Sequence, residues 1–134
     1  MKDFMFKMPA KVRFGIGLSK NIGKILKEEL GYKKVFVATD KGIVKAGILT
    51  NIEAGLAAAG MDYVIYDDLI PDPTIEVVDE AAEVLRKSGA DVVLAVGGGS
   101  PIDTAKAMCV LQTHEGSIRD YLFGGTKTVV HFVL

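Results

Sequence analysis

The sequence predicts an α/β domain of the Rossmann-like, doubly wound kind, in which helices cover both faces of a mostly parallel sheet. Apolar runs without alternating polar residues occur at 35–38, 63–66 and 92–96, and such runs are typical of parallel strands that are buried on both faces. Between these runs, apolar residues recur at the three- and four-residue spacing of helices. Strands that alternate with helices favour a parallel sheet with helices on both sides.

The first half of the chain predicts two strands and two helices. A strand at 12–16 ends among glycines, and Ser19 is the expected N-cap of a helix that Gly31 terminates. After the strand at 35–38, a helical pattern runs from residue 43 to residue 59, and Gly60 closes it.

The second half continues the alternation. The strand at 63–66 is followed by the break Pro71-Asp72-Pro73, after which Thr74 caps a helix that ends at Gly89. The strand at 92–96 leads into a helix at 101–112, and residues 121–125 form a turn.

The end of the chain differs from the rest. Residues 128–134 form an apolar, strand-like run with nothing after it, which would leave an exposed edge. We therefore expect one α/β domain over residues 1–129 and an atypical apolar tail at 130–134, where the chain is cut short or ends on a few foreign residues.

Length and composition exclude several classes of protein. The chain has 134 residues, enough for one domain, and 16 basic against 17 acidic residues give a net charge of −1. This balance argues against nucleic acid or an anionic membrane as a partner. The lone cysteine excludes a disulfide scaffold, and neither a secretory signal nor an unbroken membrane-length apolar run is present. We therefore expect a cytoplasmic protein.

A glycine-rich segment carries the chemistry of this sequence. The strand at 92–96 is followed directly by Gly97, Gly98, Gly99, Ser100 and Pro101. Ser100 is an N-cap type, Pro101 suits the first helical position, and Asp103 completes a Ser-x-x-Asp capping arrangement. Glycines let an anion approach backbone N–H groups, so a helix that begins here predicts a cradle for phosphate or pyrophosphate. The alternative is a tight strand-to-helix turn that happens to be rich in glycine, although one glycine would suffice for it.

Two better-known phosphate loops do not match. No Gly-Lys-Ser/Thr triplet follows the glycines, which excludes the nucleoside-triphosphate loop. A near match to the dinucleotide fingerprint at Gly15 and Gly17 has Lys20 where the third glycine belongs.

Two aspartates are further candidates for ligand contacts. Asp40 follows the strand at 35–38, where a carboxylate can hold the hydroxyls of an adenosine ribose and repel a 2′-phosphate, favouring NAD over NADP. It is equally suited to cap the next helix. Asp72 also lies beyond a strand end and could face the same cleft, or it could simply organise its turn.

The remaining reactive side chains predict no catalytic or metal site. Cys109 lies on an apolar helical face and is expected to be a small core residue. His114 and His131 are 131 − 114 = 17 residues apart, which is not a metal-ligand spacing.

Taken together in chain order, these segments resemble the N-terminal domain of the iron-containing (group III) alcohol dehydrogenases. The resemblance covers about residues 5 to 129 and rests on Gly97-Gly98-Gly99-Ser100-Pro101-Ile102-Asp103-Thr104-Ala105-Lys106-Ala107, Phe14-Gly15-Ile16-Gly17, Val37-Ala38-Thr39-Asp40-Lys41-Gly42, Pro71-Asp72-Pro73-Thr74 and Arg119-Asp120-Tyr121.

The resemblance implies a dehydroquinate synthase-like nucleotide-binding fold and roles for individual residues. In the family the glycine-serine loop binds the NAD(P) pyrophosphate. This loop corresponds to residues 97–100, and Asp103 follows it closely in the sequence. Asp40 corresponds to the contact with the adenosine ribose. The family usually has Pro-Asn-Pro where this chain has Asp72 between two prolines, and the added negative charge would weaken pyrophosphate binding.

The resemblance also implies a reaction. Family members transfer a hydride between the nicotinamide and a primary alcohol or aldehyde, and a separate helical domain holds iron or zinc through one aspartate and three histidines. This chain lacks those ligands, so we expect it to be the cofactor-binding half of a homo-oligomeric enzyme and inactive alone. The alternatives are the related domain of a dehydroquinate synthase, a lyase that also uses NAD and a metal, and a non-catalytic nucleotide-binding remnant.

Overall fold

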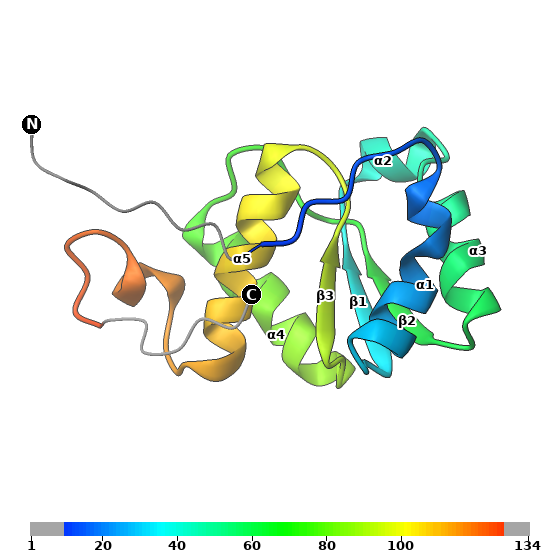
Figure 1. Ribbon diagram of the computed structural model, residues 1–134. Coiled ribbons are helices and arrows are strands. Elements are labelled where there is room, and N and C mark those ends of the chain that lie inside the picture. Colours follow the sequence, from blue (N-terminus) through cyan, green and yellow to red (C-terminus); the bar gives the residue numbers. More distant parts are fainter. Residues whose placement is uncertain (1–9, 128–134) are drawn as a thin grey trace, which may run out of the picture.

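The computed structural model describes residues 10–127, and its centre is a small parallel sheet (Figure 1). The sheet contains β1 (Lys34–Ala38), β2 (Asp62–Tyr66) and β3 (Val92–Ala95) in the order β2-β1-β3. Both pairings are parallel, and Val35 lies opposite Tyr63 on one side and Val92 on the other. The predicted strands at 35–38, 63–66 and 92–96 are therefore confirmed to within a residue at each end.

Helices cover both faces of the sheet, as predicted. On one face, Phe36 and Ala38 pack in a core cluster with residues of α4 (Ile75–Ser88) and α5 (Gly99–Thr113). On the other face, Val35 and Val37 pack with residues of η2 (Ile25–Glu29) and α3 (Thr50–Ala58), and the short α1 (Ile22–Lys24) precedes η2. Successive strand residues point to opposite faces, so the central strand contributes to both clusters. Figure 1 shows these helical layers on either side of the strands.

The helix α4 forms as the sequence predicts. The Thr74 hydroxyl accepts a hydrogen bond from the Val77 amide (3.4 Å), and Gly89 ends the helix in the left-handed conformation with a φ of 66°. Val78 and Leu85 lie on its buried side. An N-cap, one apolar face and a terminal glycine thus specify the same boundaries.

The single helix expected over residues 43–59 is wrong. The structure has α2 (Lys41–Lys45) and α3, and a turn between them contains Gly47 at a φ of 70°. A residue in the left-handed region cannot continue a right-handed helix. The apolar spacing continues through this turn, so periodicity alone did not reveal the break. Gly60, at a φ of 61°, follows the second helix as predicted.

The strand expected at 12–16 is also wrong. Residues 10–15 have no regular structure, and the side chains of Val12, Phe14 and Ile16 are all exposed. The 3-10 helix η1 (Leu18–Asn21) follows with Gly17 as its N-cap, so Ser19 lies inside the helix instead of capping it. A strand needs a neighbouring strand to accept and donate its backbone hydrogen bonds, and within residues 10–127 this segment has none.

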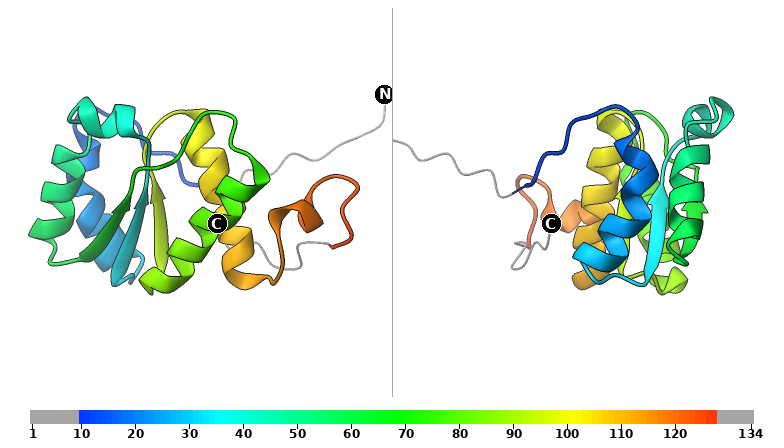
Figure 2. Two further views of the ribbon diagram at one scale, coloured as in Figure 1. Left: turned by 180° about the vertical axis from the view of Figure 1, so that it is seen from behind. Right: turned by 45° about the vertical axis from the view of Figure 1, so that its right-hand side comes forward.

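Beyond α5 the chain folds against the helical layer that α4 and α5 form, away from the strands (Figure 2). The short η3 (Ile118–Tyr121) begins with a capping box formed by Ser117 and Asp120. A turn through Gly124 follows, which confirms the turn predicted at 121–125. The expected strand at 128–134 and the expected tail at 130–134 lie outside the described residues. Within residues 10–127, no helix combines the length and the apolarity needed to cross a membrane.

Candidate functional site

The carboxyl ends of the three strands are tied together by hydrogen bonds. The Val96 amide donates to the Ala38 carbonyl (2.9 Å), and the Thr39 amide donates to the Tyr66 carbonyl (2.9 Å). The next residues along β1 and β3, Asp40 and Gly97, therefore start from adjacent points. At this edge lie α2 and the first turn of α5, both at the top of Figure 1. This is the edge at which parallel sheets place ligand-binding loops.

Asp40 caps α2 and also lies beside the glycine turn. Its Oδ1 accepts a hydrogen bond from the Ile43 amide (2.9 Å), which confirms the N-cap interpretation of this residue. A Cβ placed on Gly97 would lie 3.7 Å from Asp40 Oδ2. One carboxylate oxygen thus serves the helix while the other lies near the glycine turn. Its contact with a ribose remains a prediction.

The three glycines differ in why a glycine is present. Gly97 has a φ of 144°, and an added Cβ would lie 2.9 Å from Pro101 Cγ, so the backbone itself requires glycine there. Gly98 has a φ of −84°, which any residue can adopt, and Gly99 is helical. A Cβ on either of these two would meet no atom within 4 Å. A tight turn therefore explains Gly97 alone and leaves Gly98 and Gly99 without a structural reason.

The helix α5 begins without the cap that the sequence predicts. Gly98 is the N-cap residue, and no side chain donates to or accepts from the backbone there, so the prediction of Ser100 as N-cap is wrong. Ser100 lies inside the helix because Gly99 already has helical geometry. Asp103 is not a capping residue either, since its exposed carboxylate pairs with Lys106 (3.3 Å). The amides of the first turn are thus left to other acceptors, and they carry the positive end of the helix dipole.

Asp72 lies apart from this group. It occupies the connection between β2 and α4 in the left-handed region, with a φ of 48°, and its side chain is exposed. Asp72 makes no hydrogen bond or ion pair with any of residues 10–127, and so none with Asp40 or the glycines. Aspartate is one of the few residues that tolerates this conformation, which fits the turn-organising alternative for Asp72.

The cation next to Asp40 in the sequence, Lys41, forms an ion pair with Asp68. Lys41 Nζ lies 2.5 Å from Asp68 Oδ1, and its hydrogen bond and charge interaction with Asp68 raise the pKa of Lys41. Asp68 is also paired with Asp40 in an isolated antiparallel bridge of the backbone. The Lys41 ammonium is therefore directed to Asp68, and the candidate ribose site keeps the negative charge of Asp40.

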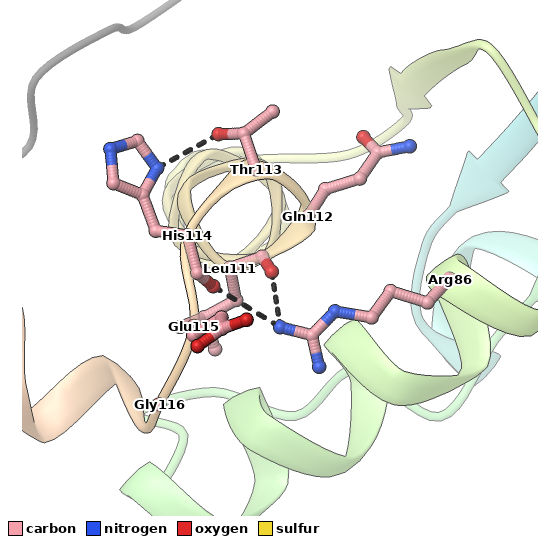
Figure 3. Close-up of a pocket in the computed structure, with 7 residues that line it drawn as sticks. All are labelled: Arg86, Leu111, Gln112, Thr113, His114, Glu115 and Gly116. Atoms are coloured by element: carbon pink, nitrogen blue, oxygen red, sulfur yellow. Dashed lines mark hydrogen bonds between the residues drawn. The ribbon is translucent and has the colours of Figure 1, made fainter.

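A separate pocket lies at the opposite end of α5 (Figure 3). Its volume is about 250 Å³, and residues 111–116 and Arg86 line it. The Arg86 guanidinium donates to the carbonyls of Leu111 and His114, which satisfies acceptors at the C-terminal end of the helix. Because a helix rises 1.5 Å per residue, the 15 residues of α5 place this pocket about 20 Å from the glycines. It is not part of the glycine site.

Within residues 10–127, neither Cys109 nor His114 adds a reactive group to the glycine site. Cys109 is only half-buried and belongs to neither core cluster, so its prediction as a core residue is wrong. Burial raises the pKa of its thiol, which disfavours the reactive thiolate. His114 stacks edge-on against Tyr121, and His131 lies outside the described residues. Residues 10–127 contain no group of three His, Cys, Asp or Glu side chains that could hold a metal ion.

Comparisons with known proteins match this chain to one family. The family model of the iron-containing alcohol dehydrogenases matches residues 9–133. Choline dehydrogenase of Bacillus subtilis (strain 168) is 40% identical over 120 residues, which are 90% of this chain and 30% of that protein. Lactaldehyde reductase of Escherichia coli (strain K12) is 43% identical over 84 residues, which are 63% of this chain and 22% of that protein.

A solved structure shows the same fold. The NADH-dependent butanol dehydrogenase A of Thermotoga maritima superposes with a TM-score of 0.90 at 33% identity, covering 99% of this chain and 33% of that one. This chain therefore spans a third or less of the length of these three relatives. The matches favour an alcohol dehydrogenase over a dehydroquinate synthase. Because the family model and the fold agree over nearly all of its residues, the chain belongs to the iron-containing alcohol dehydrogenase family.

Proposed function

We propose that this chain forms the NAD-binding part of an alcohol dehydrogenase, with the cofactor pyrophosphate held at the first turn of α5. The observation that carries this proposal is the open space in front of Gly98 and Gly99. Neither residue has a backbone conformation that requires glycine. The absence of side chains at these two positions therefore gives a ligand access to the backbone. A diphosphate fits, because it needs close access to backbone N–H groups.

The neighbouring residues suit that ligand. The amides of Gly99 and Ser100 lie in the uncapped first turn, where the helix dipole favours negative charge. Gly97 shapes the turn, and the Ser100 hydroxyl is a further donor to a phosphate oxygen. Asp103 follows Ser100 by three residues, and the ion pair with Lys106 offsets the charge of its carboxylate.

Asp40 completes the proposed site at the adenosine end. Its Oδ2 would accept hydrogen bonds from the ribose hydroxyls and would repel a 2′-phosphate, so NAD is the proposed cofactor in preference to NADP. Asp72 is retained as a peripheral candidate on the same edge of the sheet, although no described contact joins it to the glycines.

The whole reaction needs more than this chain contributes. Bound NAD would accept or deliver the hydride, while the chain's own residues bind and orient its diphosphate and ribose. By resemblance, the iron or zinc ligands belong to a separate helical domain, so we propose that this chain alone is inactive. Choline dehydrogenase, lactaldehyde reductase and butanol dehydrogenase are named after alcohols or an aldehyde, which supports a small alcohol or aldehyde as the substrate.

Three further expectations remain proposals. A cytoplasmic location rests on the lone cysteine, which suits a reducing compartment. A homo-oligomeric full-length enzyme rests on the resemblance alone. The domain division at residues 129 and 130 rests on the change in sequence character at that point.

Calorimetric titration tests the proposed site directly, because a chain without tryptophan is poorly suited to fluorescence quenching. We expect saturable binding of NAD⁺ by the folded chain and weaker binding of NADP⁺. The Gly98→Val variant should stay folded, with an N-cap penalty of about 1 kcal/mol, and should lose NAD⁺ binding. Undiminished binding by that variant, or no binding by the folded wild-type chain, would overturn the proposal.

A further inference from the structure

Thr39 is a buried polar residue at the junction between β1 and the glycine turn. Its side chain is fully buried, and among the described residues only Thr104 is a comparably buried polar side chain. The Thr39 hydroxyl Oγ1 donates a hydrogen bond of 2.8 Å to the carbonyl of Val96. That carbonyl belongs to the peptide bond that leads into Gly97.

The backbone alone does not supply this link. Pairing between β1 and β3 ends at Ala38 opposite Ala95, and the Val96 amide still donates to the Ala38 carbonyl. In a parallel ladder the next bond would run from the amide of residue 40 to the Val96 carbonyl. Here the Thr39 hydroxyl donates to that carbonyl, so a side chain supplies the hydrogen bond at the point where the ladder ends.

The reason lies in how β1 ends. The Thr39 amide donates to Tyr66, and the Thr39 carbonyl accepts from the Leu69 amide (3.2 Å), so its backbone is committed to the side of β2. Asp40 continues in that direction through its bridge with Asp68. The Thr39 side chain therefore ties this end of β1 to the β3 side.

The bond holds the peptide through which the chain enters the glycine turn. Gly97 is confined between Pro101, at 2.9 Å from an added Cβ, and Asp40 Oδ2, at 3.7 Å. The peptide between Val96 and Gly97 sets the entry direction of this turn, and through it the position of the first turn of α5. Holding the Val96 carbonyl thus keeps the two parts of the proposed cofactor site, Asp40 and the glycines, side by side.

We propose that Thr39 is a positioning residue, whose hydroxyl holds the glycine turn beside Asp40 before the cofactor arrives. The identity of the ligand rests on the proposed function, but the effect on the turn does not. Thr39 is not expected to touch the cofactor, because its side chain is buried beneath the edge of the sheet. Pre-organised sites bind more tightly because less conformational entropy is lost on binding.

Matched variants separate this role from a general loss of stability. Thr39→Val keeps the shape and removes the hydroxyl, while Thr39→Ser keeps the hydroxyl. Thr104→Val is the control, because it removes an equally buried hydroxyl whose bond to the Ser100 carbonyl (2.9 Å) stays within α5. If Thr39→Val does not fold, Thr39→Ala removes the same hydroxyl in less space.

The first readout uses the chain without cofactor. In a sample labelled with ¹⁵N-glycine, Thr39→Val should shift or broaden the amide signal of Gly97, whereas Thr39→Ser and Thr104→Val should leave it close to wild type. A wild-type Gly97 signal in Thr39→Val, or an equal disturbance in Thr39→Ser, would overturn the proposal. This outcome does not depend on whether NAD⁺ binds.

The second readout is the NAD⁺ dissociation constant, measured by calorimetry well below the unfolding temperature of each variant. Loss of one buried hydrogen bond predicts an increase of about tenfold in Thr39→Val. Thr39→Ser and Thr104→Val should remain within about threefold of wild type by the same reasoning. Wild-type affinity in Thr39→Val would overturn the positioning role, whereas failure of the wild-type chain to bind would overturn the proposed function and leave the Gly97 readout to decide on Thr39.

Discussion

At the scale of single residues, Gly97 and Gly98 are adjacent but answer different requirements. Gly97 has a backbone conformation that side chains rarely adopt, and it faces Pro101 at close range. Gly98 has an ordinary extended conformation and open space in front of it. The first glycine therefore serves the fold, and the second is free to serve a ligand.

Alanine substitutions should separate these two requirements. Gly97→Ala should lower the free energy of unfolding by about 1–3 kcal/mol, because the backbone would be strained and Pro101 would have to move. Gly98→Ala should cost at most about 1 kcal/mol, as expected at an N-cap, yet weaken NAD⁺ binding. Denaturant unfolding and calorimetry measure the two effects. An equal loss of stability in both variants would contradict this interpretation.

Asp40 combines a structural contact with a candidate ligand contact, and one substitution can separate these two roles. In Asp40→Asn the side-chain oxygen can still accept from the Ile43 amide, so α2 keeps its cap while the negative charge is lost. The ratio of NADP⁺ affinity to NAD⁺ affinity should then rise, by about tenfold if the charge repels a 2′-phosphate by about 1.4 kcal/mol. Asp40→Ala is the control that loses the cap as well. An unchanged ratio in Asp40→Asn would remove Asp40 from cofactor selection.

At the scale of elements, α4 and α5 are joined where Arg86 contacts the C-terminal end of α5. The guanidinium donates to two carbonyls that the helix leaves without intrahelical donors, those of Leu111 and His114. This contact stabilises the helical layer on one face of the sheet. It lies beside the pocket of Figure 3, at the end of α5 opposite the glycines.

Arg86→Met should therefore affect stability without affecting cofactor binding. We expect the free energy of unfolding to fall by about 1–2 kcal/mol, because carbonyls at the helix end lose a charged donor. The NAD⁺ dissociation constant should stay the same, since about 20 Å of helix separates the two ends. Lys87→Met, at the neighbouring exposed position, is the control for loss of a positive charge. A marked loss of NAD⁺ binding in Arg86→Met would show that the two ends of α5 are coupled.

The elements also differ in how well sequence patterns predict them. The boundaries of α4 follow from Thr74 and Gly89, because local hydrogen bonds and backbone geometry decide them. The division between α2 and α3 at Gly47 was missed, because apolar residues such as Leu49 and Ile52 keep a helical spacing across the turn. The apolar residues at 12–16 match a strand pattern but form no strand, because strand formation depends on a partner and not on local pattern.

At the scale of the whole molecule, the two ends of the strands have different roles. The candidate site lies at the carboxyl ends, whereas Asp91 forms hydrogen bonds at the amino ends. Its carboxylate accepts hydrogen bonds from the amide of Lys33 (2.9 Å), which precedes β1, and from the amide of Lys34 (2.9 Å), which begins β1. These bonds, that from Lys34 foremost, lower the pKa of Asp91. Asp91 therefore joins β3 to β1 at the end of the sheet remote from the glycines.

This contact predicts a pH dependence of global stability. A carboxyl group whose pKa is lower in the folded state stabilises the fold at a pH above its unfolded pKa of about 3.9. That contribution is lost as the pH falls through the folded pKa. Because Asp91 is exposed, we expect Asp91→Asn to cost only about 1 kcal/mol at pH 7.

Urea unfolding of both proteins across the acid range measures this effect. The stability difference between the wild type and Asp91→Asn should be full at pH 6, decrease below about pH 4 and approach zero at lower pH. A difference that is as large at pH 2 as at pH 6 would contradict the assignment to the ionised carboxylate.

The sequence alone determined the alternation of buried strands and helices, the glycine-rich start of α5 and the position of Asp40 at a strand end. These features are local, because propensity, apolar pattern and glycine geometry act within a few residues. The tertiary structure alone decided that Gly98 and not Ser100 occupies the N-cap position of α5, that Asp40 Oδ2 lies beside Gly97, and that Thr39 donates to Val96. Residues 39 and 96 are 57 apart in sequence, and only parallel pairing of their strands brings them into hydrogen-bonding distance.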